Sequence, residues 1–446
     1  MSTNRVAMIV GGGPAPGINA VIGAATIEAV NQGFEVLGVY DGLRWLSTGN
    51  FDAGKHTVSL DIETVSRIHF DGGSILRTAR TNLLDAERLR TSTRVAADKT
   101  KVDQTVRNLD GMGITHLITI GGDDTMLSAR FISEAVEGRI RIVHVPKTID
   151  NDLPLEHDIP TFGFASARFL GTQIVKNLMQ DSKTTGRWYL VSAMGRSAGW
   201  LAMGIGQSAG ATLTLIPEEF GERTSIQCIA DVLEGAMLKR RIMGRPDGVA
   251  VIAEGLAYRL GDREELERML GKKVPVDAAG HPRLSEIPLV DLLRKELQDR
   301  FAARGESMTI IPHDLGYELR SADPTPGDMG YCRSLGHGSI RLLQNGSGDI
   351  PPAVMVTLVN GNLHPVPLGD LIDPETNRTR VRLVDVSSDT YRVARAYMIR
   401  LEPQDLADEG VLARLATEAK MPASKFREQF QHAARRITDP AGLGQL

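Results

Sequence analysis

Residues 116–125 read His-Leu-Ile-Thr-Ile-Gly-Gly-Asp-Asp-Thr, and residues 143–154 read Val-His-Val-Pro-Lys-Thr-Ile-Asp-Asn-Asp-Leu-Pro. In both stretches a short apolar run ends in a polar cluster, which is the pattern of a buried parallel strand whose carboxyl end opens into a site. Between them, residues 125–137 place apolar side chains at roughly helical spacing. The sequence therefore predicts strand, helix and strand. Charged residues follow both strands at one edge of one sheet: Asp123, Asp124, Lys147, Asp150 and Asp152.

These charged side chains have the chemistry that phosphoryl transfer requires. The reaction needs a carboxylate that holds a metal ion, a cation that binds the polyphosphate, and a carboxylate that accepts the proton of the attacking hydroxyl. A single Asp after a buried strand is more often a turn residue. Because several charged groups follow two adjacent strands, the pattern favours a site over a set of unrelated turns.

Composition indicates an ordinary globular protein. The chain has 446 residues, of which 42% are hydrophobic and 24% charged, and its formal net charge is −4. This length predicts two domains or one elaborated α/β domain, and the charge lacks the basic footprint of a nucleic-acid-binding protein. No apolar run reaches the roughly 18 residues of a membrane span, and the first residues carry no signal-peptide core. We expect a cytoplasmic protein that binds neither nucleic acid nor membrane. The two cysteines, Cys228 and Cys332, are expected to be free buried thiols.

A glycine-rich turn follows the first predicted strand, residues 5–10. Residues 11–19 read Gly-Gly-Gly-Pro-Ala-Pro-Gly-Ile-Asn, and residues 19–30 have the composition of a helix. Such a turn offers backbone N–H groups and a positive helix end to phosphate oxygens. A dinucleotide fingerprint would need glycine at Pro16, and a P-loop would need Gly-Lys-Ser or Gly-Lys-Thr. Phosphate binding and a simple tight turn both stay open for this stretch alone.

Two arginines accompany a second glycine turn within residues 70–81. On a helical turn, Arg77 and Arg80 would share one side and could clamp a polyphosphate, although a solvated pair is an equal alternative. Asp41, after the second predicted strand, is interpreted as a turn residue.

A second α/β unit is predicted downstream. Its strands are expected at residues 187–193, 211–216 and 248–253, and each is followed by polar residues. Further predicted elements are a helix at 197–210, an inserted helical lobe at about 259–305, a hairpin at 354–367, and surface helices at 391–401 and 405–430, the last broken at Pro422.

Together these stretches resemble the phosphofructokinase superfamily, and most closely its pyrophosphate-dependent members. The matched pieces are Gly-Gly-Pro-Ala-Pro-Gly-Ile-Asn (12–19), Gly-Gly-Ser-Ile-Leu-Arg-Thr-Ala-Arg (72–80), Gly-Gly-Asp-Asp-Thr (121–125), Pro-Lys-Thr-Ile-Asp-Asn-Asp (146–152), Met-Gly-Arg (194–196), Glu-Gly (254–255) and Gly-Tyr-Glu-Leu-Arg (316–320). The pieces occur in the family's order, and the third and fourth are the most specific.

The resemblance implies two Rossmann-like three-layer α/β domains with the active site in the cleft between them. Residues 1–152 with about 325–385 would bind the phosphoryl donor. Residues 153–324 with about 386–446 would bind the sugar phosphate and contain the insert. The implied reaction is reversible, Mg²⁺-dependent transfer of a phosphoryl group from pyrophosphate to the 1-hydroxyl of fructose 6-phosphate. It gives fructose 1,6-bisphosphate and phosphate, in glycolysis or gluconeogenesis.

Two kinds of alternative stay open. The nearer one is an ATP-dependent 6-phosphofructokinase or a pyrophosphate-dependent kinase of another sugar or polyol. The more distant one is a nucleotide-binding or dinucleotide-binding oxidoreductase or regulatory module, and the missing fingerprint at Pro16 counts against it.

The resemblance also implies roles for single residues. Asp150 would take the proton of the 1-hydroxyl, Asp152 and Arg196 would be further catalytic residues, and Asp123 would bind Mg²⁺. Pyrophosphate would be bound by Gly13, Arg80, Asp124 and Lys147. The sugar phosphate would be bound by Thr148, Arg187, Met194, Gly195, Arg196, Glu254, Tyr317 and Arg320. Arg187 matches an arginine that the family often supplies from a neighbouring subunit, which implies a homodimer or homotetramer.

Asp124 is the residue expected to select the donor. ATP-dependent relatives carry glycine there, and a carboxylate would fill that space and repel a nucleotide. Two like charges about 4 Å apart cost roughly 4 kcal/mol at an effective dielectric near 20, which is on the order of a thousandfold in affinity. Lys147 would add a cation for pyrophosphate. A helix N-cap is the structural alternative for Asp124.

The acceptor is less firmly specified than the donor. Some pyrophosphate enzymes carry a basic residue just before the Gly-Tyr pair, but residues 311–315 read Ile-Pro-His-Asp-Leu. The 6-phosphate would then rest on Arg187, Arg320 and Tyr317, with help from His313.

Overall fold

The computed structural model describes residues 4–156, 159–261, 263–274, 287–344 and 350–435. Contacts divide these residues into two compact units. The first takes in the described residues up to Ala167 together with Tyr317–Arg382, and the second takes in those of 168–316 and those after Arg382. The contacts thus change unit at 167, 316 and 382, whereas the predicted limits lie at 152, about 325 and about 385.

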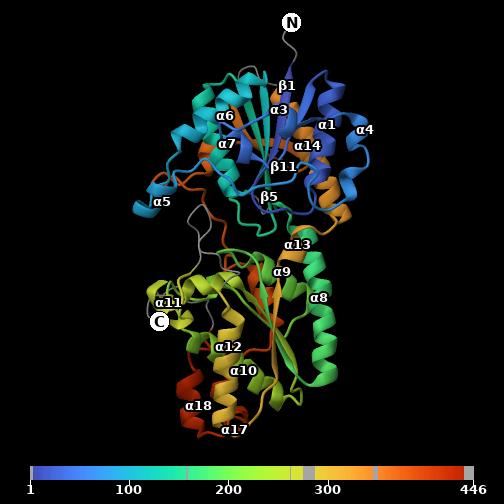
Figure 1. Cartoon of the computed structure of the whole chain (residues 1–446). Coiled ribbons are helices and arrows are strands. Elements are labelled where there is room, and N and C mark those ends of the chain that lie inside the picture. Colours follow the sequence, from blue (N-terminus) through green and yellow to red (C-terminus); the bar gives the residue numbers. More distant parts are fainter. Residues whose placement is uncertain (1–3, 157–158, 262, 275–286, 345–349, 436–446) are drawn as a thin grey trace. The chain divides into compact units, whose positions relative to one another are not determined.

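The first unit is built on a sheet with the strand order β12-β11-β5-β4-β1-β2-β3, in which β6 also pairs with β5 (Figure 1). The strands are β1 (Arg5–Val10), β2 (Glu35–Val39), β3 (Thr57–Ser59), β4 (His116–Gly121), β5 (Arg141–Thr148), β6 (Phe162–Gly163), β11 (Ala353–Val359) and β12 (Asn362–Pro367). The central strands β2, β1, β4, β5 and β11 are parallel, and β3 and β12 are antiparallel edges. β2 pairs with one side of β1 and β4 with the other, so the strand order reverses there. In open α/β sheets, ligands bind beyond the carboxyl ends of the strands at this switch point.

Alternation along the strands explains why both faces of this sheet are covered. On β1, Val6, Met8 and Val10 belong to one core cluster, and Ala7 and Ile9 to the other, because successive side chains point to opposite faces. The first cluster includes residues of α1 (Ile18–Asn31) and α14 (Pro326–Gln344), and the second includes residues of α6 (Lys99–Gly111) and α7 (Asp123–Val136). The shorter helices of this unit are α2 (Leu43–Leu46), α3 (Ala53–His56), α4 (Ile62–Val65), η1 (Ile68–Phe70), α5 (Ala86–Thr91), α13 (Tyr317–Arg320) and η5 (Leu368–Leu371).

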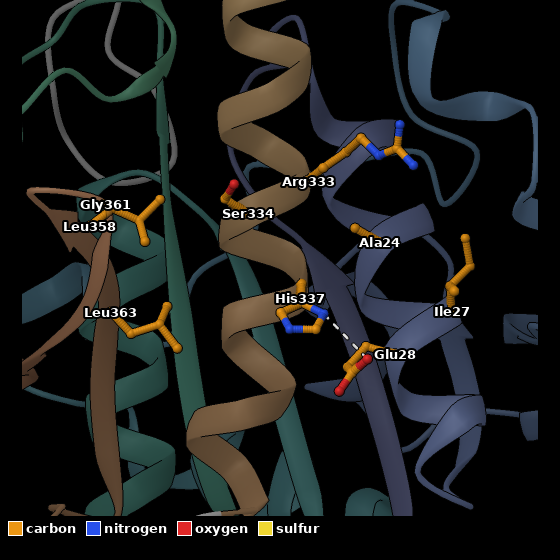
Figure 2. A pocket seen from close by; sticks show the side chains of 9 residues that line it. All are labelled: Ala24, Ile27, Glu28, Arg333, Ser334, His337, Leu358, Gly361 and Leu363. Atoms are coloured by element: carbon orange, nitrogen blue, oxygen red, sulfur yellow. Dashed lines mark ion pairs between the residues drawn. The ribbon is translucent and has the colours of Figure 1, made fainter.

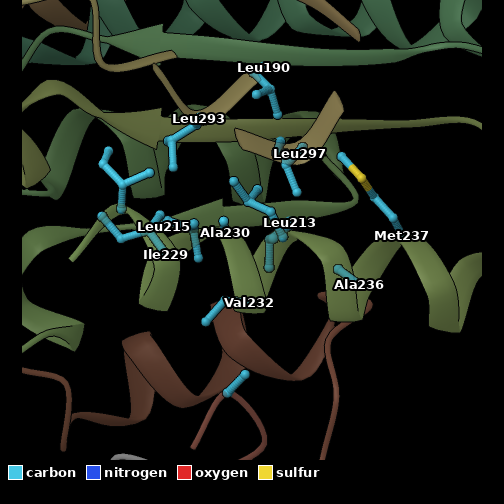
Figure 3. Close-up of a cluster of buried hydrophobic side chains, with 14 of the residues drawn as sticks. Leu190, Leu213, Leu215, Ile229, Ala230, Val232, Ala236, Met237, Leu293 and Leu297 are labelled. Carbon is cyan, nitrogen blue, oxygen red and sulfur yellow. The ribbon is translucent and has the colours of Figure 1, made fainter. Parts of the chain in front are cut away.

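The second unit contains a four-stranded parallel sheet in the order β10-β7-β9-β8. Its strands are β7 (Trp188–Ala193), β8 (Leu213–Leu215), β9 (Gly248–Ala253) and β10 (Ile310–Leu315). Figure 3 shows Leu190 and Leu213 of this sheet packed with Ile229 of α10 (Ile226–Ile242) and Leu293 of α12 (Leu289–Ala303). The other helices are α8 (Phe164–Thr185), which begins in the first unit, α9 (Trp200–Ala209), η2 (Pro217–Glu219), η3 (Glu254–Arg259), α11 (Arg263–Leu270), α15 (Asp389–Ala396), α16 (Pro403–Ala407), α17 (Glu409–Glu418) and α18 (Ala423–Phe430).

The predicted architecture of two α/β units is confirmed. The helix expected at 19–30 is α1, the three strands of the second unit are β7, β8 and β9, and the hairpin is β11 with β12. Residues 405–430 form three helices, α16, α17 and α18, and not one broken helix. Of the predicted lobe at 259–305, residues 275–286 lie outside the described residues, and α12 packs against α10, β7 and β10.

Two further expectations concern membranes and thiols. Across the described part of the chain, no helix is long and apolar enough to span a membrane. Cys332 is a buried free thiol as expected, whereas Cys228 is only half-buried.

Candidate active site

The glycines that end β1 and β4 let the start of α7 approach both strands. Gly11 follows β1, and its N–H donates to the Ile120 carbonyl of β4 at 2.9 Å. A Cβ atom on either Gly11 or Gly121 would come within 2.3 Å of Thr125, in the first turn of α7. Because only glycine leaves room for this approach, α7 begins directly at the switch point.

The turn after β1 is held by segments that are distant in sequence. The Gly12 N–H donates to the Ala79 carbonyl at 2.9 Å, and the Thr78 hydroxyl donates to the Gly12 carbonyl at 2.6 Å. Gly12 has a φ of 81°, in the left-handed region that favours glycine. The next carbonyl, of Gly13, accepts a hydrogen bond from the ammonium group of Lys147. The glycine-rich turn is therefore tied directly to the end of β5.

Lys147 is the buried cation of this site, with only 4% of its surface exposed. Burial first, and the positive charge of Arg320 second, lower the pKa of Lys147 to about 8, while Asp150, Asp123 and Asp152 oppose this shift. All four charged neighbours therefore act on one ammonium group. Asp123, Lys147, Asp150 and Asp152, four of the five charged residues expected at this edge of the sheet, thus lie close to one another.

Asp150 lies in a tight turn directly after β5. Its N–H donates to the Thr148 hydroxyl at 3.0 Å, and the Thr148 carbonyl accepts from the Thr161 hydroxyl at 2.7 Å. Asn151 has a φ of 58°, and its side-chain oxygen accepts from the Thr161 N–H at 3.0 Å. Asp150, Asn151 and Asp152 are all buried. The turn thus has a defined conformation that fixes where both carboxylates stand.

Arg382 is the residue of this site that the sequence does not reveal. Its backbone N–H donates to the Asp152 carbonyl at 2.8 Å, and its Nε donates to the Asn151 carbonyl at 3.1 Å. Its Nη1 donates to the Ile159 carbonyl at 2.8 Å, and its Nη2 donates to the Asn151 side chain. More than two hundred residues separate the partners, and no motif connects them, so sequence reasoning had no signal to find this contact.

Asp124 is a first-turn residue of α7 and not its N-cap. The N-cap is Gly122, and Asp123 and Asp124 both follow it in the first turn. The carboxylate of Asp124 accepts from the Asn82 amide at 3.4 Å. The N-cap alternative is therefore wrong, although a negative charge at this helix end is still stabilising.

Arg77 and Arg80 do not form the predicted helical clamp. The segment is not helical, and Arg77 has a φ of 55°. The Arg77 guanidinium lies 3.7 Å from the Asp41 carboxylate and 5.1 Å from the centre of the Tyr40 ring, so it belongs to the turn after β2. Arg80 is exposed and directly follows Ala79, whose carbonyl binds Gly12. Only Arg80 therefore stays beside the glycine-rich turn.

In the second unit, Glu254 shapes the turn that follows β7. One oxygen of its carboxylate accepts from the Gly195 N–H at 3.2 Å and from the Arg196 N–H at 3.0 Å. A Cβ atom on Gly255 would come within 2.3 Å of the Arg196 carbonyl. Glu254 and Gly255 together hold the segment that begins at Met194. The predicted sugar-binding residues of β7 and β9 are thus brought together by the pairing of these two strands.

Arg187 is not part of that group. It immediately precedes β7, whereas Met194 immediately follows it, so the six-residue strand separates them by about 20 Å. The Arg187 guanidinium lies 4.0 Å from the Asp181 carboxylate. Within one chain the two ends of β7 cannot contact the same small ligand.

Tyr317 and Arg320 occupy the short helix α13 of the first unit. Tyr317 is 66% exposed, and the Arg320 guanidinium lies 5.1 Å from the centre of its ring. A Cβ atom on Gly13 would stand 3.4 Å from that guanidinium, so Arg320 borders the glycine-rich turn. His313 lies inside β10, opposite Val191 of β7.

A groove of about 450 Å³ lies elsewhere on the first unit, bordered by α1, α14 and the β11–β12 hairpin. Figure 2 shows two of its lining residues, His337 and Glu28, pointing toward each other, with the His337 Nδ1 atom 3.3 Å from a carboxylate oxygen of Glu28. The groove contains none of the predicted site residues, so the strand-end cluster is the candidate active site.

Comparisons with known proteins identify the family of the chain. The family model for phosphofructokinase matches residues 5–343. The chain is 50% identical to the pyrophosphate--fructose 6-phosphate 1-phosphotransferase of Thermotoga maritima, over 96% of this chain and 98% of that protein. It is 43% identical to the protein of the same name from Naegleria fowleri, over 95% of this chain and 94% of that one. The crystal structure of Pichia pastoris phosphofructokinase in the T-state is similar in fold, with a TM-score of 0.63 and 20% identity over 97% of this chain and 39% of that chain. The predicted family is confirmed: the chain belongs to the phosphofructokinase family.

Proposed function

We propose that this protein transfers a phosphoryl group reversibly from pyrophosphate to the 1-hydroxyl of fructose 6-phosphate, with Mg²⁺. The observation that carries the proposal is the buried ammonium of Lys147 among Asp123, Asp150, Asp152 and Arg320. The names of the two relatives that match almost the whole chain support pyrophosphate over ATP as the donor.

Pyrophosphate would bind at the glycine-rich turn and the start of α7. Lys147 supplies a positive charge there, Gly13 brings the backbone close, and Arg80 lies beside the turn. A positive helix end and backbone N–H groups add to the attraction for phosphate oxygens. Asp124 limits the donor to pyrophosphate because its charge opposes the additional phosphate of a nucleotide.

Asp150 is the proposed base. A carboxylate within reach of the 1-hydroxyl accepts its proton as the oxygen attacks phosphorus, and the turn held by Arg382 fixes that carboxylate. Asp152 and Arg196 are the further proposed catalytic residues. Because positioning and charge neutralisation suffice for this reaction, no covalent enzyme intermediate is required.

The donor set fits Mg²⁺ rather than a metal held by protein alone. Among the described residues, no group of three or more His, Cys, Asp or Glu side chains is arranged to hold a metal ion. Mg²⁺ typically binds one or two carboxylates together with phosphate oxygens and water. Asp123 would supply the carboxylate, and the ion would neutralise charge on the transferred phosphoryl group.

The sugar phosphate would be held by Thr148 and by Met194, Gly195, Arg196 and Glu254 after β7 and β9, with Tyr317 and Arg320 at its 6-phosphate. Arg187 stands at the far end of β7, so we propose that it serves the site of a neighbouring subunit in a homodimer or homotetramer. A cytoplasmic location stays a prediction.

Initial rates with fructose 6-phosphate and Mg²⁺ test the function, with pyrophosphate and ATP compared as donors. Turnover with pyrophosphate and little with ATP is the expected result. Strong turnover with ATP would contradict the donor assignment. If fructose 6-phosphate gives no turnover with either donor, and another sugar or polyol is turned over with pyrophosphate, the assignment of fructose 6-phosphate as the acceptor would be contradicted.

A further inference from the structure

Glu218 is a carboxylate in η2, the short helix that follows β8, and the proposed function assigns it no role. Its side chain is partly buried. One oxygen of this carboxylate accepts from the Gly199 N–H at 2.9 Å and from the Val384 N–H at 2.9 Å. A single side chain thus joins two segments of the second unit that are distant in sequence.

The first of these segments is the turn that carries Arg196. Arg196 has a φ of 54°, in the left-handed region, and a residue other than glycine keeps such a conformation only where surrounding contacts hold it. The carboxylate of Glu254 accepts from the N–H groups of Gly195 and Arg196 at the start of the turn. Glu218 accepts from the N–H of Gly199 at its end, where Gly199 is the N-cap of α9. Two carboxylates therefore hold this turn, one at each end.

The same turn packs closely against η2. A Cβ atom on Gly199 would come within 2.4 Å of the Ile216 Cβ atom and within 2.6 Å of a Glu218 carboxylate oxygen. A Cβ atom on Gly255 would stand 2.8 Å from the Pro217 ring. Because glycine alone leaves room for these contacts, a displacement of Glu218 would be transmitted directly to the turn.

The second segment follows Arg382, which holds the turn after β5. The contacts of the chain assign Arg382 to the first unit and Leu383 to the second. Val384, which is buried, donates its N–H to Glu218. The segment is therefore anchored on both sides of the point where the chain passes from one unit to the other, by the Arg382 hydrogen bonds on one side and by Glu218 on the other.

We propose that Glu218 is a positioning residue for phosphoryl transfer, which fixes the turn that carries Arg196 and anchors the segment through which Arg382 holds the Asp150 turn. This inference rests on the proposed function. Glu218 acts through these backbone segments and not on the reacting atoms. A carboxylate suits the role because hydrogen bonds to an ionised acceptor are stronger than those between neutral groups.

Amide hydrogen exchange, followed by mass spectrometry, tests the two anchors without any turnover. In Glu218→Ala the N–H groups of Gly199 and Val384 lose their acceptor, so they should exchange at least about tenfold faster than in the native chain. Glu218→Gln keeps an acceptor oxygen and should stay near the native rates. The Gly12 N–H, bonded to the Ala79 carbonyl, is the reference and should not change. Native protection of both amides in Glu218→Ala would overturn the proposal.

Initial rates with pyrophosphate and fructose 6-phosphate test the effect on the reaction. Since a misplacement of about 1 Å can cost about 10²-fold in rate, Glu218→Ala should lower kcat by between about tenfold and 10²-fold. It should raise KM for fructose 6-phosphate and not KM for pyrophosphate, because the Arg196 turn belongs to the proposed sugar site. Glu218→Gln should recover most of the loss, and Glu222→Ala, which changes an exposed carboxylate nearby, should behave as native. Native kinetics in Glu218→Ala, or an equal loss in Glu218→Gln, would contradict the positioning role.

The double variant Glu218→Ala with Arg382→Met tests whether the two residues act through one segment. Residues that share a structural unit have effects that do not add, so kcat should fall no more than a few-fold below that of Arg382→Met alone. A loss equal to the product of the two single losses would contradict this coupling.

Two further outcomes are separated by these measurements. If Glu218→Ala fails to fold, Glu218→Asp replaces it with the same expected results, since it keeps the charge and shortens the side chain by one carbon. A native chain without turnover of these substrates would contradict the proposed function, and the exchange rates would still decide whether Glu218 anchors both segments.

Discussion

The lowered pKa of Lys147 predicts how kcat/KM for pyrophosphate depends on pH. Its ammonium is charged below a pKa of about 8 and neutral above it. Because the proposed donor site needs the positive charge, kcat/KM for pyrophosphate should fall above pH 8, by up to about tenfold per pH unit. The measurement is kcat/KM for pyrophosphate between pH 7 and 10. Lys147→Arg, whose side chain stays charged throughout this range, should remove the fall. A flat profile to pH 9.5 in the native protein would show that this charge is not used.

The charge of Asp124 is expected to determine whether pyrophosphate or ATP is accepted as the donor. Asp124→Gly combined with Lys147→Gly should improve kcat/KM for ATP relative to pyrophosphate by between about tenfold and a thousandfold, because a repulsive charge is removed. Asp124→Asn is the matched control, since it removes the charge and keeps the volume. If Asp124→Asn gives most of the improvement in kcat/KM for ATP, charge repulsion by Asp124 is the main reason that ATP is rejected. If it gives none, the volume of the Asp124 side chain is the main reason. If neither the double variant nor Asp124→Asn improved the use of ATP, the donor argument would lose its basis.

The conformation of the turn after β5 depends on Arg382, which is distant from it in sequence. Arg382→Met removes the side-chain hydrogen bonds that hold Asn151 and Ile159, so the Asp150 carboxylate should lose its fixed position. A misplacement of about 1 Å can cost about 10²-fold in rate. We therefore expect kcat to fall by about that factor while KM for pyrophosphate changes little.

Arg380→Met is the control variant for Arg382→Met. Arg380 is exposed, and its side chain donates one long hydrogen bond, at 3.4 Å, to the Ile372 carbonyl. The Arg380→Met variant should therefore have a kcat near the native value. Equal losses in both variants would indicate general damage to the segment, and a native kcat in Arg382→Met would refute the positioning role.

The elements show what sequence reasoning can and cannot reach. The strands β4 and β5 are predictable because apolar runs that end in Gly, Asp and Lys need only local pattern, and their parallel pairing then gathers Asp123, Lys147 and Asp150. Of the two alternatives for Arg77 and Arg80, the helical clamp is excluded because the left-handed backbone of Arg77 turns it toward Asp41, which spacing alone does not reveal. Arg382 acts across more than two hundred residues, so its contacts depend on tertiary folding.

At the scale of the whole molecule, the position of Arg187 leads to a prediction about whether subunits share active sites. If it completes a neighbouring site, Arg187→Ala and Asp150→Asn should each be nearly inactive. Co-expression of the two should restore activity, because one hybrid site then carries both native residues. In a random mixture of dimers, about a quarter of native activity is expected. Absence of recovery, with hybrids demonstrated by differently tagged chains, would mean that Arg187 acts within its own subunit or not at all.

The most direct test of the proposed reaction is kcat for fructose 1,6-bisphosphate formation from pyrophosphate in Asp150→Asn beside the native chain. The variant keeps the size of the side chain and removes the proposed base. We predict a fall of about 10²-fold to 10⁴-fold, with KM for both substrates within a few-fold of native. Asp110→Asn, an exposed aspartate paired with Arg139, should behave as native. Turnover of Asp150→Asn within a factor of about two of the native chain would contradict the assignment of the base, and with it the proposed mechanism.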